Sequence, residues 1–314
     1  MTALSSRLDE YLALRRSLGF DLAFTERVLR TFTRYAETAG HCTITTDIFL
    51  AWKQDYGSAN VNTWATRLGM VRGFATWLQG YDGKTEVPPS GLISGRAVRP
   101  QPHIYQPQHI TQLVAEAGHL PSAYGLRGLL CQTLFGLIAV TGLRVNEALH
   151  LTDLDVDIVT GLLSIRKTKN GRDRFIPITP CTVAHLKSYA CERDRLLTRQ
   201  SDRFFLKEDG KPIGDCSARY NFAQVSQRLG LREPQVFNRH GIGPRIHDLR
   251  HSFAVHTILD WFREGRDIDR EMYRLSTYLG HVKPEHTYWY IEAVPELLQL
   301  AAERAERRYR EARK

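Results

Sequence analysis

A stretch rich in proline and glycine, about a third of the way along the chain, separates two parts of different character. Residues 83–108, GKTEVPPSGLISGRAVRPQPHIYQPQ, are dense in Pro, Gly and Ser. This composition breaks helices and is typical of linkers. The chain has 314 residues, which exceeds the length at which a single hydrophobic core usually stops growing. We therefore predict two domains, over residues 1–95 and 107–314, joined by a linker over residues 96–106.

Helical periodicity dominates both predicted domains. In the first, apolar residues recur at three- and four-residue spacing, as in the run from Trp64 to Leu78. In the second, GLLCQTLFGLIAVTGL is apolar enough to form a buried core helix. The β signal there is LLSIRKTKNGRDRFIPI, in which two extended runs flank Asn170-Gly171, a strong hairpin cue. The predicted fold class is mainly α with a small β-sheet: a small helical bundle, then a mixed α+β domain that is mostly helical.

Charge and composition narrow the class of partner. The net charge is +9 and the sequence pI is about 9.4, which favours a polyanion such as DNA or RNA. The five cysteines are odd in number and form no CxxC pair, so we expect reduced thiols. No apolar run approaches the roughly 18 residues of a membrane span. Asp9 and Glu10 stand where a signal peptide would need an apolar core. We predict a soluble cytoplasmic protein without membrane association.

The segment RIHDLRHSFAVH places His247, Arg250 and His251 at helical positions i, i+3 and i+4, and therefore on one face. Two histidines four residues apart match a metal-ligand spacing. The neighbouring Arg250 and the missing Glu of an HExxH motif argue against a metal, so we predict no metal at this segment. The other two interpretations are a purely structural role and an anion site. An anion site would use the planar donor fork of Arg and the transferable proton of His.

Two further motifs complete a pattern. AVTGLRVNEALHL places Arg144 at the start of a helical pattern with Glu147 one turn later. YLGHVKPEHTYWYIE contains a Leu-Gly-His motif that ends at His281, followed by Tyr290. With the hairpin lysine and the HxxR segment, these residues resemble the tyrosine recombinase (phage integrase) family in its Xer-like branch. The resemblance covers essentially the whole chain. It implies a SAM-like helical core-binding domain followed by the catalytic domain.

The resemblance also implies a reaction. Tyr290 would attack a DNA phosphodiester, which gives a covalent 3′-phosphotyrosine and a free 5′-hydroxyl without any cofactor. Arg144 and Arg250 would clamp the non-bridging phosphate oxygens, where negative charge concentrates in the transition state. His247 would act in acid–base catalysis, and His281 would hydrogen-bond a phosphate oxygen.

The hairpin and one acidic residue would supply the remaining groups. By resemblance, Lys169 protonates the leaving 5′-oxygen and Glu147 supports the site. Strand alternation places Lys167 on the same face as Lys169, so the residues themselves leave the choice between these two lysines open. We predict that Lys167, Arg172 and Arg174 contact DNA.

Tyr288 is the alternative nucleophile. Two residues apart on a helix, Tyr288 and Tyr290 point roughly 200° away from each other, so only one of them can face the phosphate. The family spacing selects Tyr290. The connector between the HxxR and Leu-Gly-His motifs is longer than is usual in the family, and we predict an extra loop over Trp261 to Asp269. For His251 we expect only a packing role.

The predicted function is a site-specific DNA recombinase or integrase that acts on double-stranded DNA carrying a specific recombination site, as in transposition of a mobile element. The alternatives are a type IB topoisomerase-like enzyme and a DNA-binding accessory protein without catalysis. By resemblance, the C-terminal run VPELLQLAAERAERRYREARK is a tail helix that docks onto a neighbouring protomer. The assembly would be a homotetramer, or a mixed tetramer with related recombinases, on DNA. Packing of the tail on its own domain is the other interpretation.

Overall fold

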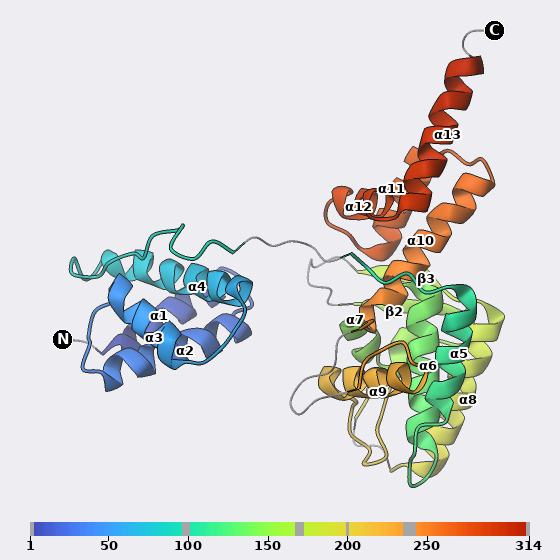
Figure 1. Ribbon diagram of the computed structural model, residues 1–314. Coiled ribbons are helices and arrows are strands. Elements are labelled where there is room, and N and C mark those ends of the chain that lie inside the picture. Colours follow the sequence, from blue (N-terminus) through green and yellow to red (C-terminus); the bar gives the residue numbers. More distant parts are fainter. Residues whose placement is uncertain (1–2, 96–100, 167–172, 199–200, 235–242, 312–314) are drawn as a thin grey trace. The chain divides into compact units, whose positions relative to one another are not determined.

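The computed structural model describes residues 3–95, 101–166, 173–198, 201–234 and 243–311. It divides the chain into two compact units, Met1–Pro100 and Gln101–Lys314, each with its own hydrophobic core (Figure 1). Residues 96–100 of the predicted linker lie outside the described residues. The predicted fold class, mainly α with a small β-sheet, is confirmed. Within the described residues, no helix combines the length and the apolar character that crossing a membrane would require.

Unit 1 is a small helical bundle. Aromatic rings fill much of its core, and Trp52 packs edge-on against Trp64 with ring centroids 5.2 Å apart. Edge-on packing of this kind is favourable because the positive ring edge meets the negative ring face. Two of the helices begin behind capping side chains: Thr45 accepts a hydrogen bond from the backbone N–H of Ile48, and Asn60 accepts one from that of Thr63. Over residues 3–95 its helices are α1 (Leu4–Ser17), α2 (Ala23–Thr38), α3 (Thr46–Asp55) and α4 (Val61–Gln79).

Unit 2 is built around the predicted core helix, which is present as α6 (Leu126–Thr141) and is buried along most of its length. Its position in Figure 1 agrees with the burial pattern, because neighbouring helices cover it on several sides. The helices that contact α6 are α5 (Pro107–Gly118), α7 (Val145–Leu149), α8 (Pro180–Leu196), α9 (Asp215–Arg228) and α10 (His247–Arg263).

The small sheet of unit 2 confirms the predicted hairpin. It has three antiparallel strands in the order β1 (Val156–Asp157), β2 (Leu162–Ile165) and β3 (Arg174–Pro177), and a short 3-10 helix, η1 (Asp153–Asp155), precedes it. In the register of β2 and β3, Ile165 lies opposite Arg174. The tip of the hairpin, residues 167–172, lies outside the described residues.

A second core of unit 2 joins α10 to α11 (Ile268–Leu279), α12 (Glu285–Ala293) and the start of α13 (Pro295–Glu311). The predicted extra loop over Trp261 to Asp269 is wrong over most of its length. Helix α10 continues to Arg263 because Trp261 and Phe262 pack against this core. Helix α11 starts at Ile268, capped by the carboxylate of Asp267, so only residues 264–267 connect the two helices.

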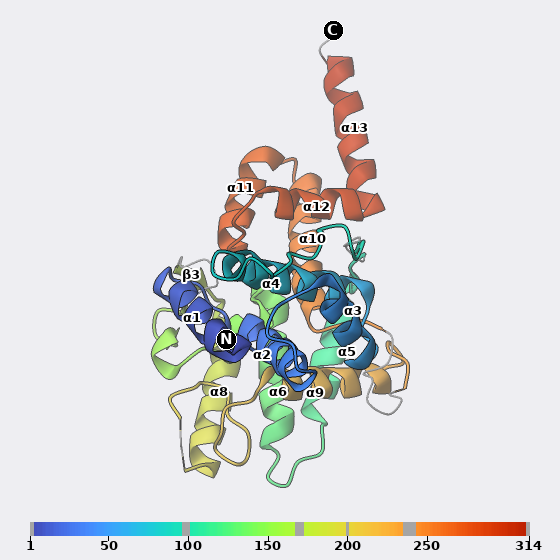
Figure 2. The same ribbon diagram turned by 90° about the vertical axis from the view of Figure 1, so that its left-hand side faces the viewer.

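Helix α13 packs on the second core of unit 2 through its first two turns. Leu297 is fully buried against α10 and α12, whereas Leu298 is 48% exposed and Tyr309 is 59% exposed. Both views show the rest of the helix extending away from α10–α12 (Figures 1 and 2).

Candidate active site

The side chain of Arg250 hydrogen-bonds to two loops that are far apart in the sequence of unit 2. The residue lies in the first turn of α10 and is only 1% exposed. Its Nη1 donates to the carbonyl of Gly142 (2.6 Å), and its Nη2 donates to the carbonyl of Leu279 (2.8 Å). The same Nη2 lies 3.0 Å from Nε2 of His281. One guanidinium therefore fixes the loop after α6, the loop after α11 and the imidazole of the Leu-Gly-His motif.

Two glycines in left-handed conformation allow these loops to meet. Gly142 (φ +62°) ends α6 and Gly280 (φ +67°) ends α11, at the position where left-handed glycine commonly terminates a helix. A Cβ at residue 142 would lie 2.5 Å from the ring of Phe253. A Cβ at residue 280 would lie 2.9 Å from Nη1 of Arg174. A side chain at either position would strain the left-handed backbone and would have to displace the ring of Phe253 or the guanidinium of Arg174.

Glu147 is the acid that balances the arginines of the site. Its carboxylate accepts hydrogen bonds from Nη1 of Arg144 (2.7 Å) and from Nη2 of Arg174 (2.8 Å). It also accepts the backbone N–H of Arg144 at the start of α7 (3.0 Å). Burial acts to raise the pKa of Glu147, but the hydrogen bonds and charges of Arg174 and Arg144 outweigh it and lower the pKa to about 2. The carboxylate is therefore ionised at neutral pH.

Arg144 and Arg174 occupy different environments. Besides its pair with Glu147, Arg144 donates from Nη2 to the carbonyl of Gly280 (2.8 Å), and its side chain stays 34% exposed. Arg174 is 12% exposed, and its Nε donates to the carbonyl of Tyr278 (2.8 Å). This placement gives no support to the predicted DNA contact of Arg174, because its guanidinium points inward to Glu147. Arg144 is the arginine open to an incoming anion.

The ring of His281 is held between two partners. Its Nδ1 lies 2.7 Å from Oγ1 of Thr287, which is fully buried. Since the guanidinium of Arg250 can only donate, Nε2 of His281 accepts, and the ring proton belongs on Nδ1. The motif that predicts His281 as a site residue thus places it against Arg250.

His247 is uncharged in this environment. Burial lowers the pKa of His247 to about 4, helped by the positive charges of Arg250, Arg245 and Arg144. Burial and the charge of Arg144 also lower the pKa of Arg250, to about 10, so Arg250 keeps its charge at neutral pH. The site thus combines fixed guanidinium charge with a neutral imidazole that can accept a proton.

Tyr290 and Tyr288 face different surroundings on α12. Tyr290 is 1% exposed, and its Oη lies 3.0 Å from Nδ1 of His251. Tyr288 is 38% exposed, and its hydroxyl donates to Asp269 (3.4 Å). The expectation that only one of these tyrosines faces the site agrees with this geometry.

The packing role expected for His251 needs correction, because its ring contacts the phenol oxygen of Tyr290. The signal in the sequence was its position four residues after His247, on the same face of the helix.

The hairpin residues Lys167, Lys169 and Arg172 lie outside the described residues. The strand that follows them in the chain reaches the site, because β3 begins with Arg174 and the guanidinium of Arg174 contacts Glu147.

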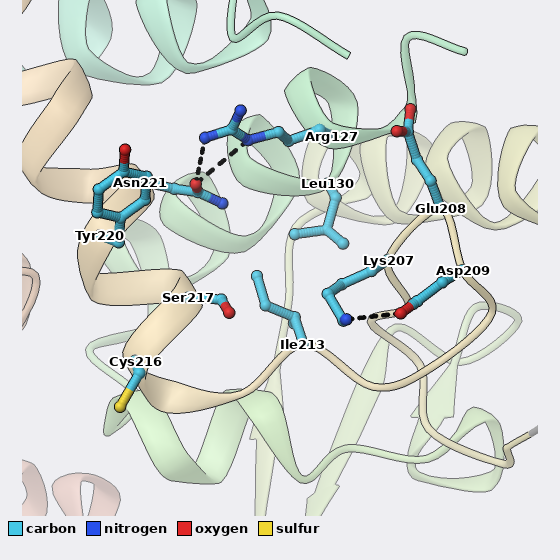
Figure 3. Close-up of a pocket in the computed structure, with 10 residues that line it drawn as sticks. All are labelled: Arg127, Leu130, Lys207, Glu208, Asp209, Ile213, Cys216, Ser217, Tyr220 and Asn221. Carbon is cyan, nitrogen blue, oxygen red and sulfur yellow. Dashed lines mark hydrogen bonds and ion pairs between the residues drawn. The ribbon is translucent and has the colours of Figure 1, made fainter. Parts of the chain in front are cut away.

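A pocket of about 600 Å³ lies apart from these residues (Figure 3). It adjoins Arg127 and Leu130 in the first turns of α6. Arg127 lies roughly 20 Å along this helix from its last residue, Thr141, after which the chain continues to Arg144. In it Arg127 donates to Asn221 and Lys207 pairs with Asp209. None of the predicted site residues is among the residues that line it, which are Arg127, Leu130, Lys207, Glu208, Asp209, Ile213, Cys216, Ser217, Tyr220 and Asn221.

The site defines a class of protein. Guanidinium groups and histidine rings near a tyrosine hydroxyl suit chemistry at a phosphate ester. Residues 106–296 match the model of the phage integrase family. The chain therefore belongs to the phage integrase family, that is, to the tyrosine recombinases, which break and rejoin DNA. The predicted family and enzyme class are confirmed, and the recombinase interpretation is favoured over a topoisomerase or a non-catalytic accessory protein.

Similar proteins include two curated relatives. The putative integrase/recombinase y4rB of Sinorhizobium fredii (strain NBRC 101917 / NGR234) is 38% identical, over 98% of this chain and 99% of its own length. Tyrosine recombinase XerD of Caulobacter vibrioides is 30% identical, over 79% of this chain and 77% of its own.

Solved structures share the fold. The integrase of the Tn1549 transposon, in complex with transposon right end DNA, aligns over 96% of this chain and 98% of its own with a TM-score of 0.64 at 15% identity. The XerH recombinase in a post-cleavage complex aligns over 82% of this chain and 70% of its own with a TM-score of 0.58 at 20% identity.

Proposed function

We propose that this protein is a site-specific recombinase of a mobile element and that Tyr290 cleaves the DNA strand. The proposal rests on a chain of contacts that leads to Tyr290. Arg144 and Arg250 both bond to the loop at Leu279 and Gly280, and Arg250 also lies against His281. Arg250 interacts electrostatically with Tyr290, whose hydroxyl contacts His251. The names of the relatives, an integrase/recombinase and a transposon integrase, support the mobile-element part. The substrate would be double-stranded DNA with a specific recombination site, met in the cytoplasm.

Each residue has a role in one balanced step. The phenol oxygen of Tyr290 bonds to phosphorus, the bond from phosphorus to O5′ breaks, and a 3′-phosphotyrosine remains. Arg144 and Arg250 stabilise the charge on the non-bridging oxygens. When the phosphate enters, one of these oxygens takes the place of the Arg250 guanidinium at Nε2 of His281, and the ring proton moves from Nδ1 to Nε2, so that His281 donates a hydrogen bond to the phosphate. The phosphate approaches from the side of Arg144, the more exposed of the two arginines.

Proton transfer completes the step. His247, neutral at working pH, serves as an acid–base group near the scissile phosphate. We assign the proton for the leaving O5′ to Lys169, with Lys167 as the alternative donor and, with Arg172, a contact to the DNA backbone. Glu147 keeps Arg144 in place and takes no part in the chemistry.

Trapping of the covalent intermediate tests the proposal. Duplexes are made from the DNA that flanks the gene of this protein, with a nick that lets the short 5′-hydroxyl fragment diffuse away after cleavage. We expect an SDS-resistant protein–DNA adduct that forms on the duplexes containing the recombination site and not on shuffled duplexes. Relaxation of any supercoiled plasmid, without preference for the flanking DNA, would favour the topoisomerase-like alternative instead.

We further propose that the tail helix docks onto a neighbouring protomer in a tetramer, of identical or related subunits, on paired sites. The exposure of the apolar side chain of Leu298 on α13 (48%) supports this, because an apolar surface of this kind suits contact with another subunit. A lambda integrase of similar fold (14% identity, TM-score 0.61) was solved as a tetramer on a Holliday junction.

Truncation of the tail checks the assembly. Leu297 and Leu300 pack on the second core, so the chain is cut after Ala302 to preserve those contacts. We expect unchanged affinity for a single half-site and a smaller complex on paired sites by light scattering. A truncated protein that still forms complexes of full size would contradict docking by the tail.

A further inference from the structure

We propose that His251 is a further catalytic residue, which orients the hydroxyl of Tyr290 and takes its proton when the tyrosine attacks phosphorus. The inference rests on the proposed role of Tyr290 as the nucleophile.

The contact between these residues is built into the core of unit 2. His251 (6% exposed) lies on α10 and Tyr290 (1% exposed) on α12, and the two helices pack together. Nδ1 of His251 lies 3.0 Å from Oη of Tyr290, within hydrogen-bonding distance. The ring of Trp289 lies beside both, with its centroid 5.8 Å from that of His251 and 5.5 Å from that of Tyr290. Water is therefore excluded from a contact that involves the reacting oxygen.

A base at this position answers a chemical need. A phenol has an ordinary pKa near 10 and is a poor nucleophile at neutral pH until its proton leaves. A neutral imidazole with its proton on Nε2 accepts the phenol O–H at Nδ1. After transfer, the imidazolium donates the same hydrogen bond to the oxygen, so the geometry serves both states. The guanidinium of Arg250 interacts electrostatically with Tyr290 and favours its ionised form.

With the tyrosine proton assigned to His251, His247 transfers no proton in the cleavage step and acts as a neutral neighbour of His251 at the phosphate. The ring of His247 packs edge-on against that of His251, with centroids 4.6 Å apart. Because the pKa of His247 is lowered to about 4, a proton that arrives on His251 meets no second imidazolium beside it. The two ring nitrogens of His281 face Arg250 and Thr287. Of these three histidines, His251 is therefore the one whose ring nitrogen contacts the Tyr290 oxygen.

The step balances. As the bond from Tyr290 Oη to phosphorus forms and the bond from phosphorus to O5′ breaks, the phenol proton passes to Nδ1 of His251. The leaving O5′ takes its proton from the separate acid that we assign to Lys169. In religation the attacking 5′-hydroxyl gives its proton to the neutral amine that the acid became in cleavage, and His251 returns its proton to the tyrosine oxygen as that oxygen leaves phosphorus.

His251→Asn tests the inference on the full-length protein. The Asn side chain places an amide group near the former Nδ1, so it can hydrogen-bond the phenol but cannot take its proton. We expect adduct formation on the nicked duplex to slow by about 100-fold or more, the usual contribution of a general base, with unchanged DNA affinity. His185→Asn, at an exposed position of α8, is the matched control and should cleave at the wild-type rate.

Two chemical substitutions separate proton removal from a structural role. A fluorinated tyrosine at residue 290 loses its proton more readily, and we expect it to raise the cleavage rate of His251→Asn at least tenfold. A duplex with sulfur at the 5′-bridging position has a leaving group that needs no acid. On this duplex we expect His251→Asn to cleave slowly still, whereas variants of Lys169, the acid for the leaving group, should regain their cleavage rate. If His251→Asn fails to fold, His251→Gln is used in the same two assays.

The outcomes distinguish this inference from the proposed function. A wild-type protein that forms no adduct at Tyr290 overturns the proposed nucleophile. A wild-type adduct at Tyr290 together with His251→Asn cleaving at the wild-type rate overturns the role of His251 alone. If the 5′-sulfur duplex restores the cleavage rate of His251→Asn, then His251 protonates the leaving O5′ and does not deprotonate Tyr290, and the inference is overturned.

Discussion

Tyr290→Phe is expected to form no covalent adduct with DNA while it binds the recombination site with unchanged affinity. The substitution removes only the phenol oxygen, and the ring keeps its place in the core between α10 and α12. Removal of a nucleophile typically lowers the rate by on the order of 10⁴-fold or more. The lost hydrogen bond to His251 should lower the free energy of unfolding by only about 1 kcal/mol. SDS gels of nicked duplexes and a binding titration measure the two properties separately.

Tyr288→Phe is the matched control, two residues away on the same helix. Its hydroxyl is turned toward Asp269 and its side chain is 38% exposed. The variant should therefore cleave at the wild-type rate. The reverse result, an adduct with Tyr290→Phe and none with Tyr288→Phe, would make Tyr288 the nucleophile. It would also require α12 to turn by roughly half a revolution in the DNA complex, because two residues span about 200° on a helix.

Local patterns in the sequence predicted the parts of the fold that depend on neighbouring residues. The period of the apolar residues predicted α6 as a buried helix, and the Asn-Gly turn predicted the antiparallel pair β2 and β3. The connector after α10 was mispredicted because its length was attributed to a loop. The aromatic residues Trp261 and Phe262 instead continue the helix against the second core.

Contacts between distant segments could not be predicted from periodicity. Arg250 bonds to the carbonyl of Gly142, 108 residues away in sequence, and to that of Leu279, 29 residues away. Backbone carbonyls carry no signature in the sequence, so only the family motifs indicated that these segments meet. The same limit hid the inward orientation of Arg174, because a hairpin arginine is equally compatible with DNA and with a buried acid.

Glu147→Gln is expected to lower the free energy of unfolding of unit 2 by about 3 kcal/mol, because Glu147 pairs with both Arg144 and Arg174. The carboxylate neutralises Arg144 and Arg174, and its side chain is only 10% exposed. Loss of one partner from a buried ion pair leaves uncompensated charge, which typically costs 3–5 kcal/mol. We take the lower end because the side chain of Arg144 is 34% exposed to solvent. Gln keeps the size of the side chain, so no cavity contributes to the effect.

Hydrogen exchange of the full chain measures this effect where it arises. The buried amides of α6 and α10 report the stability of unit 2, and the amides of unit 1 serve as an internal reference. Glu116→Ala removes a more exposed pair with Arg228 and should change stability by less than about 1 kcal/mol.

The pKa of Glu147 is about 2 in the folded protein and near 4.3 when unfolded. The difference between wild type and Glu147→Gln should therefore be complete above about pH 5 and fade as the pH falls toward 2. Equal exchange rates in both proteins at pH 7 would show that the two arginines do not need this carboxylate, and the phosphate clamp would then have to be held by backbone carbonyls alone.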